Sequence, residues 1–459
     1  MVGRLTVWAD GSTSIGAGHL VRSRVLAEAL ALQGWQAQWF TPDPQGPAAW
    51  AWAGLPLQAA AGPPALGDLL LIDGYTATTP PGLPCVRIHD GPAGPTPPAD
   101  FIVEGMPGAR AADHPQAIAC AGLAHALLRP AFGPGPESRV KQQILVALGG
   151  TDAAALLPRV CDVLLAAAPQ AQLLLAGVAQ APSAHPRLQA LGLLDAQALA
   201  SQLRRVAAAV VSASGIALEA LACACPVLAI GLAANQDRLA RALSDAGVPL
   251  CRAEDLQGLA AALPAACCPQ ELRADGLGQQ RVAARIGEWW QCRSGGLLRP
   301  ARYGDAQQLY DWLSDPGVQA ASLQGGAVPS WEAHCAWFAA RLDDPRARIF
   351  IAEGPGPDGP QALGVLRLQC DADGAQAVVS LSTDPRSRGQ GLGPRLLREG
   401  LRILAHSGPR PFAQTLRALV RVDNPASLRC FVKAGFRRSA DEVINGHPTA
   451  VFLQQVVAP

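Results

Sequence analysis

The sequence predicts an α/β protein in which two domains built on parallel β-sheets precede a third domain of mixed α+β architecture. In residues 1–135 strand-like apolar runs alternate with helix-like segments, and this alternation begins again near residue 143. After residue 296 strand-like runs follow one another without helices between them, which indicates antiparallel pairing. A chain of 459 residues is also too long for one ordinary core.

The first domain is expected over residues 1–135 and begins with a short buried strand at 4–9. A polar run follows, and from Val21 apolar residues recur at helical spacing until Gly34 ends the helix. The segment 16–19 (GAGH) is therefore predicted to be a Gly-rich loop before a helix N-terminus. Glycines allow close approach of a ligand, and the unpaired N–H groups favour an anion such as a diphosphate.

Polar side chains follow several predicted strands of this domain. Five of them fall where ligands of parallel sheets bind, beyond the carboxyl ends of the strands: Asp10, His19, Asp73, Tyr75 and Asp90. An imidazole, with an unperturbed pKa of about 6.5, is well suited to take a proton from water. Arg22 is predicted to bind either a substrate phosphate or a neighbouring carboxylate, and Asp73, Tyr75 and Asp90 either contact substrate or cap turns.

The second domain is expected over residues 136–285, after a linker rich in Pro and Gly (RPAFGPGPE). Turns at 149–151 and 214–216 follow predicted strands and can offer N–H groups to a diphosphate. Glu219 lies in an apolar helix, where an unpaired carboxylate is costly, and this favours a functional role. Two Rossmann-like halves joined by a linker predict a cleft between them, which is the layout of two-domain, glycosyltransferase-B-like enzymes.

Particular segments carry a family resemblance over about residues 1–285: DGSTSIGAGHLVRSRVLAEAL, LLIDGY, LLRPAF, ILVALGGTD and SASGIALEALACACPVLAIGLAANQ. They resemble the UDP-sugar hydrolases of pseudaminic acid biosynthesis, which are relatives of MurG-type glycosyltransferases. That family hydrolyses UDP-2,4-diacetamido-2,4,6-trideoxy-β-L-altropyranose to UDP and the free sugar. The resemblance implies His19 as the general base that activates water against the anomeric carbon.

The same resemblance implies a set of substrate-binding residues: Gly18, Arg22, Tyr75, Gly150, Ser214, Glu219, Asn235 and Gln236. Glu219 stands where the wider superfamily binds ribose hydroxyls, and the Asn235-Gln236 pair would hold the sugar or the diphosphate. The chain departs from the family in two places. It has Ser214-Gly215-Ile216 where the family has Gly-Ser-Thr, and His89-Asp90 where the family has two aspartates.

Residues 286–296 are expected to be a linker, and 297–459 a third domain. At its centre a strand leads into DPRSRGQGLG (384–393) and then a helix with leucines on one face. Together with NPAS (424–427) and FVKAGF (431–436), this run resembles the pyrophosphate loop of GCN5-related N-acetyltransferases. The resemblance implies acetyl-CoA as co-substrate, a strand at 381–383 that splays from its neighbour, and cofactor-binding residues Leu381, Thr383, Arg388, Gly389, Gly391, Gly393 and Asn424.

Proton transfer in this domain is less well predicted. Phe431 stands where the family often has a tyrosine that protonates the leaving thiolate, so solvent or another donor would act. Cys430 is expected in the core. Residues 330–338 resemble the acceptor-side segment of ribosomal-protein and amino-sugar acetyltransferases, and Glu332 and His334 are either base or sugar-binding groups or part of a solvated helix face.

The two resemblances fit one pathway. The third domain resembles the acetyltransferase that acts on the 4-amino group of UDP-4-amino-4,6-dideoxy-N-acetyl-β-L-altrosamine, and the product of that reaction is the substrate of the N-terminal family. A bifunctional enzyme of pseudaminic acid biosynthesis is therefore predicted. The alternative is a MurG-like glycosyltransferase fused to a protein-directed N-acetyltransferase.

Composition excludes other classes. With 37 basic and 36 acidic residues and no basic run, a nucleic-acid partner is not expected. Apolar stretches are interrupted before about 18 residues, and no secretory signal pattern is visible, so a cytoplasmic protein without a membrane partner is expected. The 12 cysteines form no CxxC pair, which predicts reduced thiols and no metal site.

Overall fold

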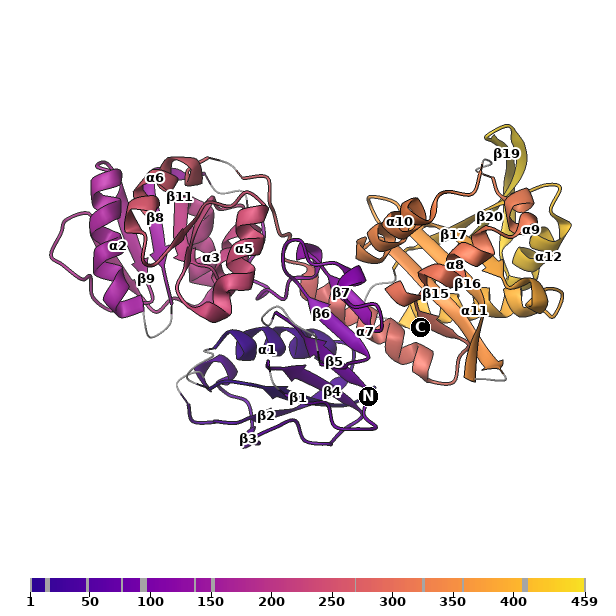
Figure 1. Cartoon of the computed structure of the whole chain (residues 1–459), viewed down its shortest axis with the longest axis horizontal. Coiled ribbons are helices and arrows are strands. Elements are labelled where there is room, and N and C mark those ends of the chain that lie inside the picture. The colour runs from indigo at the N-terminus through magenta and orange to yellow at the C-terminus, as the bar shows by residue number, and fades with distance from the viewer. Residues whose placement is uncertain are drawn as a thin grey trace. The chain divides into compact units, whose positions relative to one another are not determined.

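The structure is a computed structural model of the whole chain, coloured in Figure 1 from indigo at the N-terminus to yellow at the C-terminus. It describes residues 2–12, 17–46, 49–75, 77–90, 97–135, 138–149, 153–268, 270–323, 327–356, 359–406 and 412–457. The chain forms two compact units. The first comprises Met1–Ala109 and Ala121–Val282, and the second comprises Arg110–Cys120 and Ala283–Pro459.

A parallel β-sheet forms the N-terminal part of the first unit. Its strands are β1 (Gly3–Ala9), β2 (Trp35–Thr41), β3 (Leu57–Ala59), β4 (Leu69–Asp73), β5 (Cys85–Ile88) and β6 (Phe101–Glu104). They lie in the order β3-β2-β1-β4-β5-β6, and all these neighbours are parallel. Helix α1 (Gly18–Ala31) connects β1 to β2. The connections run outward in opposite directions from β1 and β4, so the carboxyl ends of these two strands flank a topological switch point.

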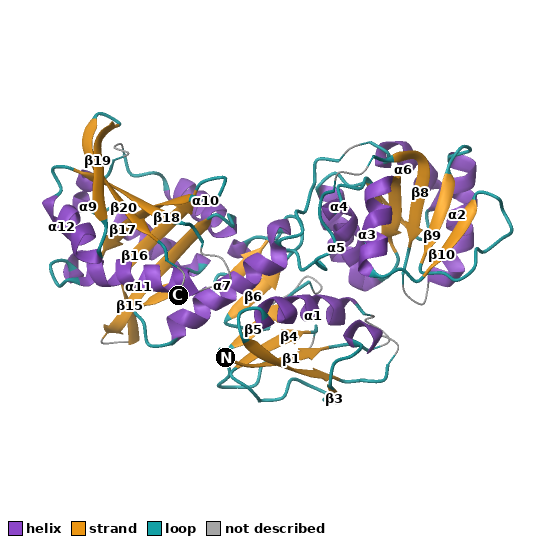
Figure 2. Cartoon of the chain, turned by 180° about the vertical axis from the view of Figure 1, so that it is seen from behind, coloured by secondary structure: helices purple, strands orange, loops and turns teal. Residues whose placement is uncertain are grey.

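A second parallel sheet follows in the same unit. Its strands are β8 (Val140–Ala147), β9 (Gln172–Ala176), β10 (Leu188–Gly192), β11 (Val206–Ser212), β12 (Val227–Gly231) and β13 (Leu250–Arg252), in the order β10-β9-β8-β11-β12-β13. The helices are α2 (Ala153–Ala167), α3 (Ala196–Arg205), α4 (Gly215–Ala222), α5 (Asp237–Asp245) and α6 (Leu256–Ala266). Buried side chains of α3, α4 and α5 form one core, and those of α2 and α6 form another. Helices therefore cover both faces of this sheet (Figure 2), and its switch point lies between β8 and β11.

The second unit contains a mixed sheet. Its strands are β14 (Leu298–Pro300), β15 (Ala347–Gly356), β16 (Gly359–Cys370), β17 (Gln376–Thr383), β18 (Thr415–Arg421), β19 (Arg437–Ile444) and β20 (His447–Gln455), in the order β14-β15-β16-β17-β18-β20-β19. All pairs are antiparallel except β17 with β18. The helices are α8 (Ala306–Leu313), α9 (Pro316–Ala321), α10 (Trp331–Asp343), α11 (Leu392–His406) and α12 (Pro425–Ala434). Helices α8 and α10 pack on one face of the sheet, and α11 and α12 pack on the other.

Two further segments belong to the second unit. The first is residues 110–120, which contain the short helix η2 (Ala111–Asp113), and Ala111 donates its N–H to Asp343 Oδ1 on α10 at 2.7 Å. The second is the C-terminal part of helix α7 (Gly278–Arg293). Its buried Glu288 accepts from Arg285 at 2.9 Å and from Arg348 of β15 at 2.7 Å. Most of the segment expected as a linker at 286–296 is thus helical.

Candidate functional sites

The candidate site of the first sheet is built at the switch point between β1 and β4. Asp73 ends β4 and is fully buried, and the N–H of Asp10, which follows β1, donates to its carbonyl at 2.9 Å. Asp90 follows β5. His19 was expected in a loop, but it lies in the first turn of α1, directly after Gly18. The structure brings together the side chains of His19, Arg22, Asp73, Tyr75 and Asp90.

Arg22 holds the two carboxylates of this site. Its Nε and Nη2 donate to Asp73 at 2.6 Å, and its Nη1 and Nη2 donate to Asp90. Four of the five N–H bonds of the guanidinium are therefore used. Of the two roles expected for Arg22, the structure shows pairing with carboxylates. Burial disfavours ionisation of Asp90, but the charge of Arg22 outweighs it and lowers the pKa of Asp90 to about 2.

His19 lies between these two carboxylates without being tied to either. Its Nδ1 is 3.6 Å from Asp73 Oδ1 and its Nε2 is 4.0 Å from Asp90 Oδ1, and neither ring nitrogen has a hydrogen-bond partner among the described residues. The side chain is only 4% exposed. Two carboxylates and one guanidinium leave one surplus negative charge beside the ring. This charge would stabilise an imidazolium formed when His19 takes a proton.

Tyr75 forms one wall of the site. Its ring meets the imidazole of His19 edge to face, with the centroids 4.8 Å apart. Burial first and then the charge of Asp90 raise the pKa of Tyr75 to about 12. Tyr75 is therefore a neutral phenol at physiological pH and can donate a hydrogen bond but does not act as a base.

Arg87 was not predicted from the sequence. It is a buried cation on β5, and it donates to the carbonyls of Ala77 at 2.8 Å and Gly74 at 3.4 Å. These bonds fix the loop that carries Tyr75. The signal in the sequence was a charged residue inside the apolar strand CVRI, which a parallel strand buried on both faces tolerates only when its charge has partners.

The predicted residues of the second domain that the structure describes follow strands β11 and β12 in the chain. Ser214 precedes α4 after β11, and its Oγ is 2.8 Å from that of Ser212. Gly150 lies outside the described residues. Asn235 is exposed in the short helix η4 (Ala234–Gln236), directly before α5, and Gln236 uses its Oε1 to accept from the N–H of Leu232 at 3.0 Å.

Glu219 has a partner that the sequence did not reveal. Arg129, 90 residues earlier, donates from Nε and Nη2 to the two carboxylate oxygens, both at 2.8 Å. Burial raises the pKa of Glu219, and Arg129 opposes this shift. The expectation for Glu219 was based on an unpaired buried carboxylate. Because Arg129 supplies the counter-charge, burial alone no longer argues for a ligand at Glu219.

In the second unit, the pairing between β17 and β18 covers only the first half of β17. Their parallel pairing runs from Gln376 opposite Thr415 to Val379 opposite Ala418 and stops there, although β17 continues to Thr383. The predicted splay at 381–383 is confirmed. On this side the backbone of residues 380–383 has no strand partner within the described part of the chain, so an extended ligand can pair with it.

The loop after β17 contains two glycines with positive φ and open space around them. Gly389 and Gly391 have φ of 77° and 73°, and a Cβ on either would meet nothing within 4 Å. Gly393 instead allows α11 to pack closely against α12, since a Cβ added at this position would lie 2.7 Å from Cys430 Sγ. Arg388 donates to Asp315 at 2.7 Å.

Two other polar side chains of this domain hold local structure, one at the start of α12 and one at the start of the loop after β17. Asn424 caps α12, accepting from the N–H of Ser427 at 3.0 Å. Asp384 accepts two side-chain hydrogen bonds from Arg386, which hold the pKa of Asp384 well below its usual range, and a third from Trp312 at 3.1 Å.

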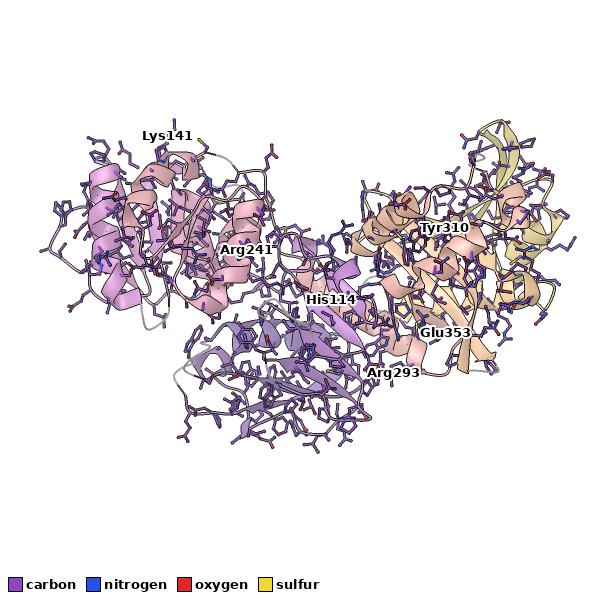
Figure 3. All side chains as sticks on the ribbon, in the orientation of Figure 1. His114, Lys141, Arg241, Arg293, Tyr310 and Glu353 are labelled. Carbon is purple, nitrogen blue, oxygen red and sulfur yellow. The ribbon has the colours of Figure 1, made fainter. Side chains whose placement is uncertain are left out.

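The acceptor-side residues differ from expectation. His334 does not lie on a solvated helix face but is buried, with Nε2 3.0 Å from the carbonyl of Ala306, and burial lowers its pKa. It packs against the ring of Tyr310 of α8, with the ring centroids 5.2 Å apart, and Tyr310 is labelled in Figure 3. Glu332 is exposed. Cys430 was expected in the core but is only partly buried, and burial raises the pKa of its thiol to about 11, whereas the neighbouring Phe431 is buried.

The described residues contain neither a cluster of metal ligands nor a membrane-spanning helix. No group of three or more His, Cys, Asp or Glu side chains there is placed to hold a metal ion, and all 12 cysteines are free thiols. No helix in the described ranges combines the length and apolar character needed to cross a membrane.

Residues 297–437 match the family described as the acetyltransferase (GNAT) domain. Solved structures that resemble this chain include the aminoglycoside acetyltransferase AAC(6')-Ib with coenzyme A and kanamycin (19% identity, 34% of this chain and 93% of that chain, TM-score 0.29). Another is the spermidine N-acetyltransferase of Vibrio cholerae with CoA and spermine (17% identity, 34% and 94%, TM-score 0.31). No curated protein shows significant similarity to the chain. By the first of these matches, the C-terminal part of the chain is an acetyltransferase domain of the GNAT family.

Proposed function

We propose that the chain is a bifunctional enzyme of pseudaminic acid biosynthesis. The C-terminal domain transfers the acetyl group of acetyl-CoA to the 4-amino group of UDP-4-amino-4,6-dideoxy-N-acetyl-altrosamine. The N-terminal, glycosyltransferase-B-like pair of Rossmann-like domains then hydrolyses the product, UDP-2,4-diacetamido-2,4,6-trideoxy-β-L-altropyranose, to UDP and the free sugar. The observation that carries the hydrolase half is His19, with two unpartnered ring nitrogens between Asp73 and Asp90.

In the hydrolytic step His19 takes a proton from water as the water oxygen attacks the anomeric carbon. The bond between that carbon and the UDP oxygen breaks, and the electron pair leaves with UDP. The surplus negative charge of the Asp73, Asp90 and Arg22 cluster stabilises the imidazolium. Because His19 is 4% exposed, substrate binding has to admit water to the ring. Gly18, at the start of α1, offers an N–H to the sugar or phosphate.

In the second Rossmann-like domain, backbone N–H groups of the turns after β8 and β11, at Gly150 and Gly215, would stabilise the leaving diphosphate together with the hydroxyl of Ser214, whose own N–H donates to the carbonyl of Ser212 at 2.7 Å. Asn235, exposed at the helix start, would hold the sugar or the diphosphate together with Gln236. Glu219, oriented by Arg129, would accept from the ribose hydroxyls.

In the acetyl transfer step the neutral amine nitrogen attacks the thioester carbonyl carbon, and the carbon–sulfur bond breaks. The pantetheine chain of acetyl-CoA would lie along Leu381 and Thr383, where β17 has no partner on the β18 side. Its diphosphate would be cradled by Gly389 and Gly391, whose positive φ and open surroundings fit that role. Arg388, within this loop, and Asn424, at the start of α12, would contact coenzyme A. The nitrogen loses a proton to solvent as the amide forms, and solvent protonates the thiolate because Phe431 has no hydroxyl.

Mass spectrometry of purified protein with UDP-4-amino-4,6-dideoxy-N-acetyl-altrosamine, with and without acetyl-CoA, tests the proposal. Free diacetamido sugar and UDP should form only when acetyl-CoA is present. Acetylated UDP-sugar that persists would overturn the hydrolase half and favour a glycosyltransferase that needs another acceptor. An unchanged amino sugar would overturn the acetyltransferase half for this substrate.

A further inference from the structure

Arg367 lies on β16, beside its cross-strand neighbour Ser380 of β17. Its side chain is on the face that α8 and α10 cover, because the alternate residue Val365 packs into that core. Arg367 donates from Nε to Ser380 Oγ at 3.2 Å, and its guanidinium carbon lies 5.8 Å from the ring centroid of Trp337 on α10. Trp337 is 37% exposed, so the arginine is next to solvent rather than in the core.

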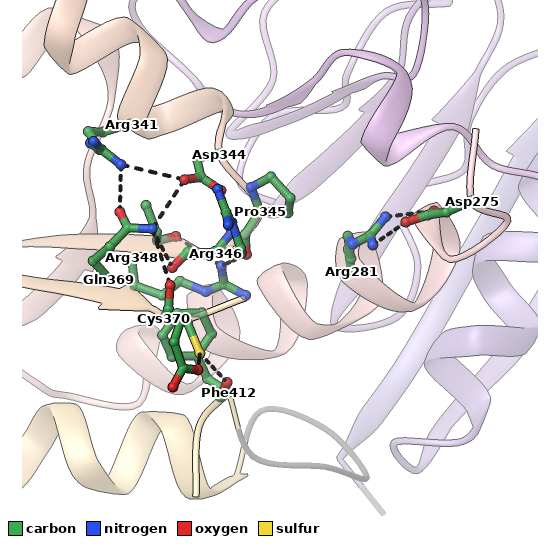
Figure 4. Close-up of polar contacts among 12 residues, drawn as sticks. Asp275, Arg281, Arg341, Asp344, Pro345, Arg346, Arg348, Gln369, Cys370 and Phe412 are labelled. Atoms are coloured by element: carbon green, nitrogen blue, oxygen red, sulfur yellow. Dashed lines mark hydrogen bonds and ion pairs between the residues drawn. The ribbon is translucent and has the colours of Figure 1, made fainter. Parts of the chain in front are cut away.

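Among the described residues Arg367 has no carboxylate partner. Its neighbours on the same face are neutralised: Arg417 donates to both oxygens of Glu442 at 2.8 Å, and Arg341 pairs with Asp344 at 3.5 Å (Figure 4). Burial lowers the pKa of Arg367, and no acid opposes the shift. A half-buried cation without a counter-ion is costly, and a bound anion would remove that cost.

The position of Arg367 relates this charge to catalysis. Ser380 is the first residue of β17 beyond the last pair with β18, Val379 opposite Ala418. The guanidinium therefore lies where the gap between β17 and β18 begins. The thioester of acetyl-CoA would bind in this gap. A cation at this point repels a polycationic acceptor such as a polyamine, and it attracts an acceptor that carries negative charge.

We propose that Arg367, beside the exposed ring of Trp337, is the residue through which the acetyltransferase domain recognises the diphosphate of a nucleotide-linked amino sugar. This inference rests on the proposed function for the identity of the acceptor. It adds a residue that sets specificity, on the acceptor side of the domain and separate from the loop that would bind coenzyme A.

The kinetic test compares two acceptors for acetyl transfer: the UDP-linked 4-amino sugar and the methyl glycoside of the same sugar, which has no phosphate. Arg367→Gln should raise KM for the UDP-linked acceptor by about 10- to 100-fold, as expected for losing a hydrogen bond to a charged group, and Arg367→Lys should recover part of it. The kinetics of the methyl glycoside should stay within about twofold. Arg417→Gln, which changes a paired arginine on the same face, should change neither acceptor. An equal loss for both acceptors, or no loss, would overturn the assignment.

A binding test separates this inference from the proposed function. In full-length protein labelled with 5-fluorotryptophan, the ¹⁹F resonance of Trp337 is assigned with Trp337→Phe, and inorganic pyrophosphate is then added. The resonance should shift in the unmodified protein and in Arg417→Gln, and should not shift in Arg367→Gln. No shift in the unmodified protein would overturn the anion site. A shift without acetylation of the UDP-linked sugar would keep the anion site and reject the proposed acceptor.

Discussion

The Nδ1 atom of His19 lies 3.6 Å from Oδ1 of Asp73, which is too far for a hydrogen bond but close enough for a strong electrostatic interaction. Asp73 instead directs both carboxylate oxygens at Arg22, each 2.6 Å from a guanidinium nitrogen. The imidazole is therefore placed by packing, and neither of its ring nitrogens has a hydrogen-bond partner among the described residues. This arrangement leaves a ring nitrogen available to the water that the proposed hydrolysis requires.

Replacing His19 by Asn should lower the rate of UDP release from the diacetamido UDP-sugar by about 100-fold or more, because the variant has no base to take the proton of water. The rate is measured by chromatography of UDP with pre-acetylated substrate. Acetyl transfer to the amino sugar by the same variant is the internal control and should be unchanged. Loss of both reactions would contradict separate sites.

Replacing Arg22 by Met should destabilise the fold by about 3 kcal/mol at pH 7, because Asp73 and Asp90 would be left near each other without a cation. In the native protein the lowered pKa of Asp90, about 2, adds stability above pH 4 that is lost as the pH falls from 4 to 2. In the variant the carboxylates gain protons more readily, so its deficit should shrink as the pH is lowered from 7 to 4.

Urea unfolding at pH 7, 5.5 and 4 measures this deficit. Arg252→Met is the control in the same unit, because Arg252 pairs with Asp237 at 3.0 Å and both side chains are largely exposed. Its effect should stay below about 0.5 kcal/mol at each pH. A deficit for Arg22→Met that does not depend on pH would contradict the charge argument.

Gly391→Ala should raise KM for acetyl-CoA by about tenfold or more, because φ of 73° strains alanine and the loop would relax away from its open geometry. Gly374→Ala is the control, since Gly374 has φ of 76° in the turn between β16 and β17 and also has open space around it. Similar KM changes in both variants would mean that backbone strain acts through the whole domain.

The pair Arg129 and Glu219 allows a structural role to be separated from substrate binding. Arg129→Met alone should destabilise the fold by about 3 kcal/mol, because it leaves a buried carboxylate unpaired. Adding Glu219→Gln should restore most of this stability. If Glu219 binds the ribose, KM for the UDP-sugar should still be raised about tenfold in the double variant, and full recovery of KM would reject that role.

The sequence predicted the strands and helices that carry the sites, because strands buried on both faces of a parallel sheet are continuous apolar runs. Strand β4 (LLLID) and strand β11 (VAAAVVS) are examples. Strand β19 was missed since its residues, RRSADEVI, are polar and almost all exposed at the edge of the sheet.

The candidate sites were predicted in part, for a similar reason. Asp73, Asp90 and His19 each follow a strand or start a helix, and the switch point of the sheet brings such positions together. Ion pairs between distant segments have no local signal, so the partnership of Arg129 with Glu219 was not foreseen. Arg87 was missed because a single charged residue in an apolar strand gives no indication of the carbonyl groups that it will bind.

The chain enters the second unit twice, first at residues 110–120 and again from residue 283. No single peptide bond therefore divides the protein into its two units. A fragment starting at residue 297 would lack Ala111, whose N–H bonds to Asp343, and Glu288, which pairs with Arg348. A gene split into two reading frames before residue 283 would leave the first product carrying residues 110–120, which belong to the second unit.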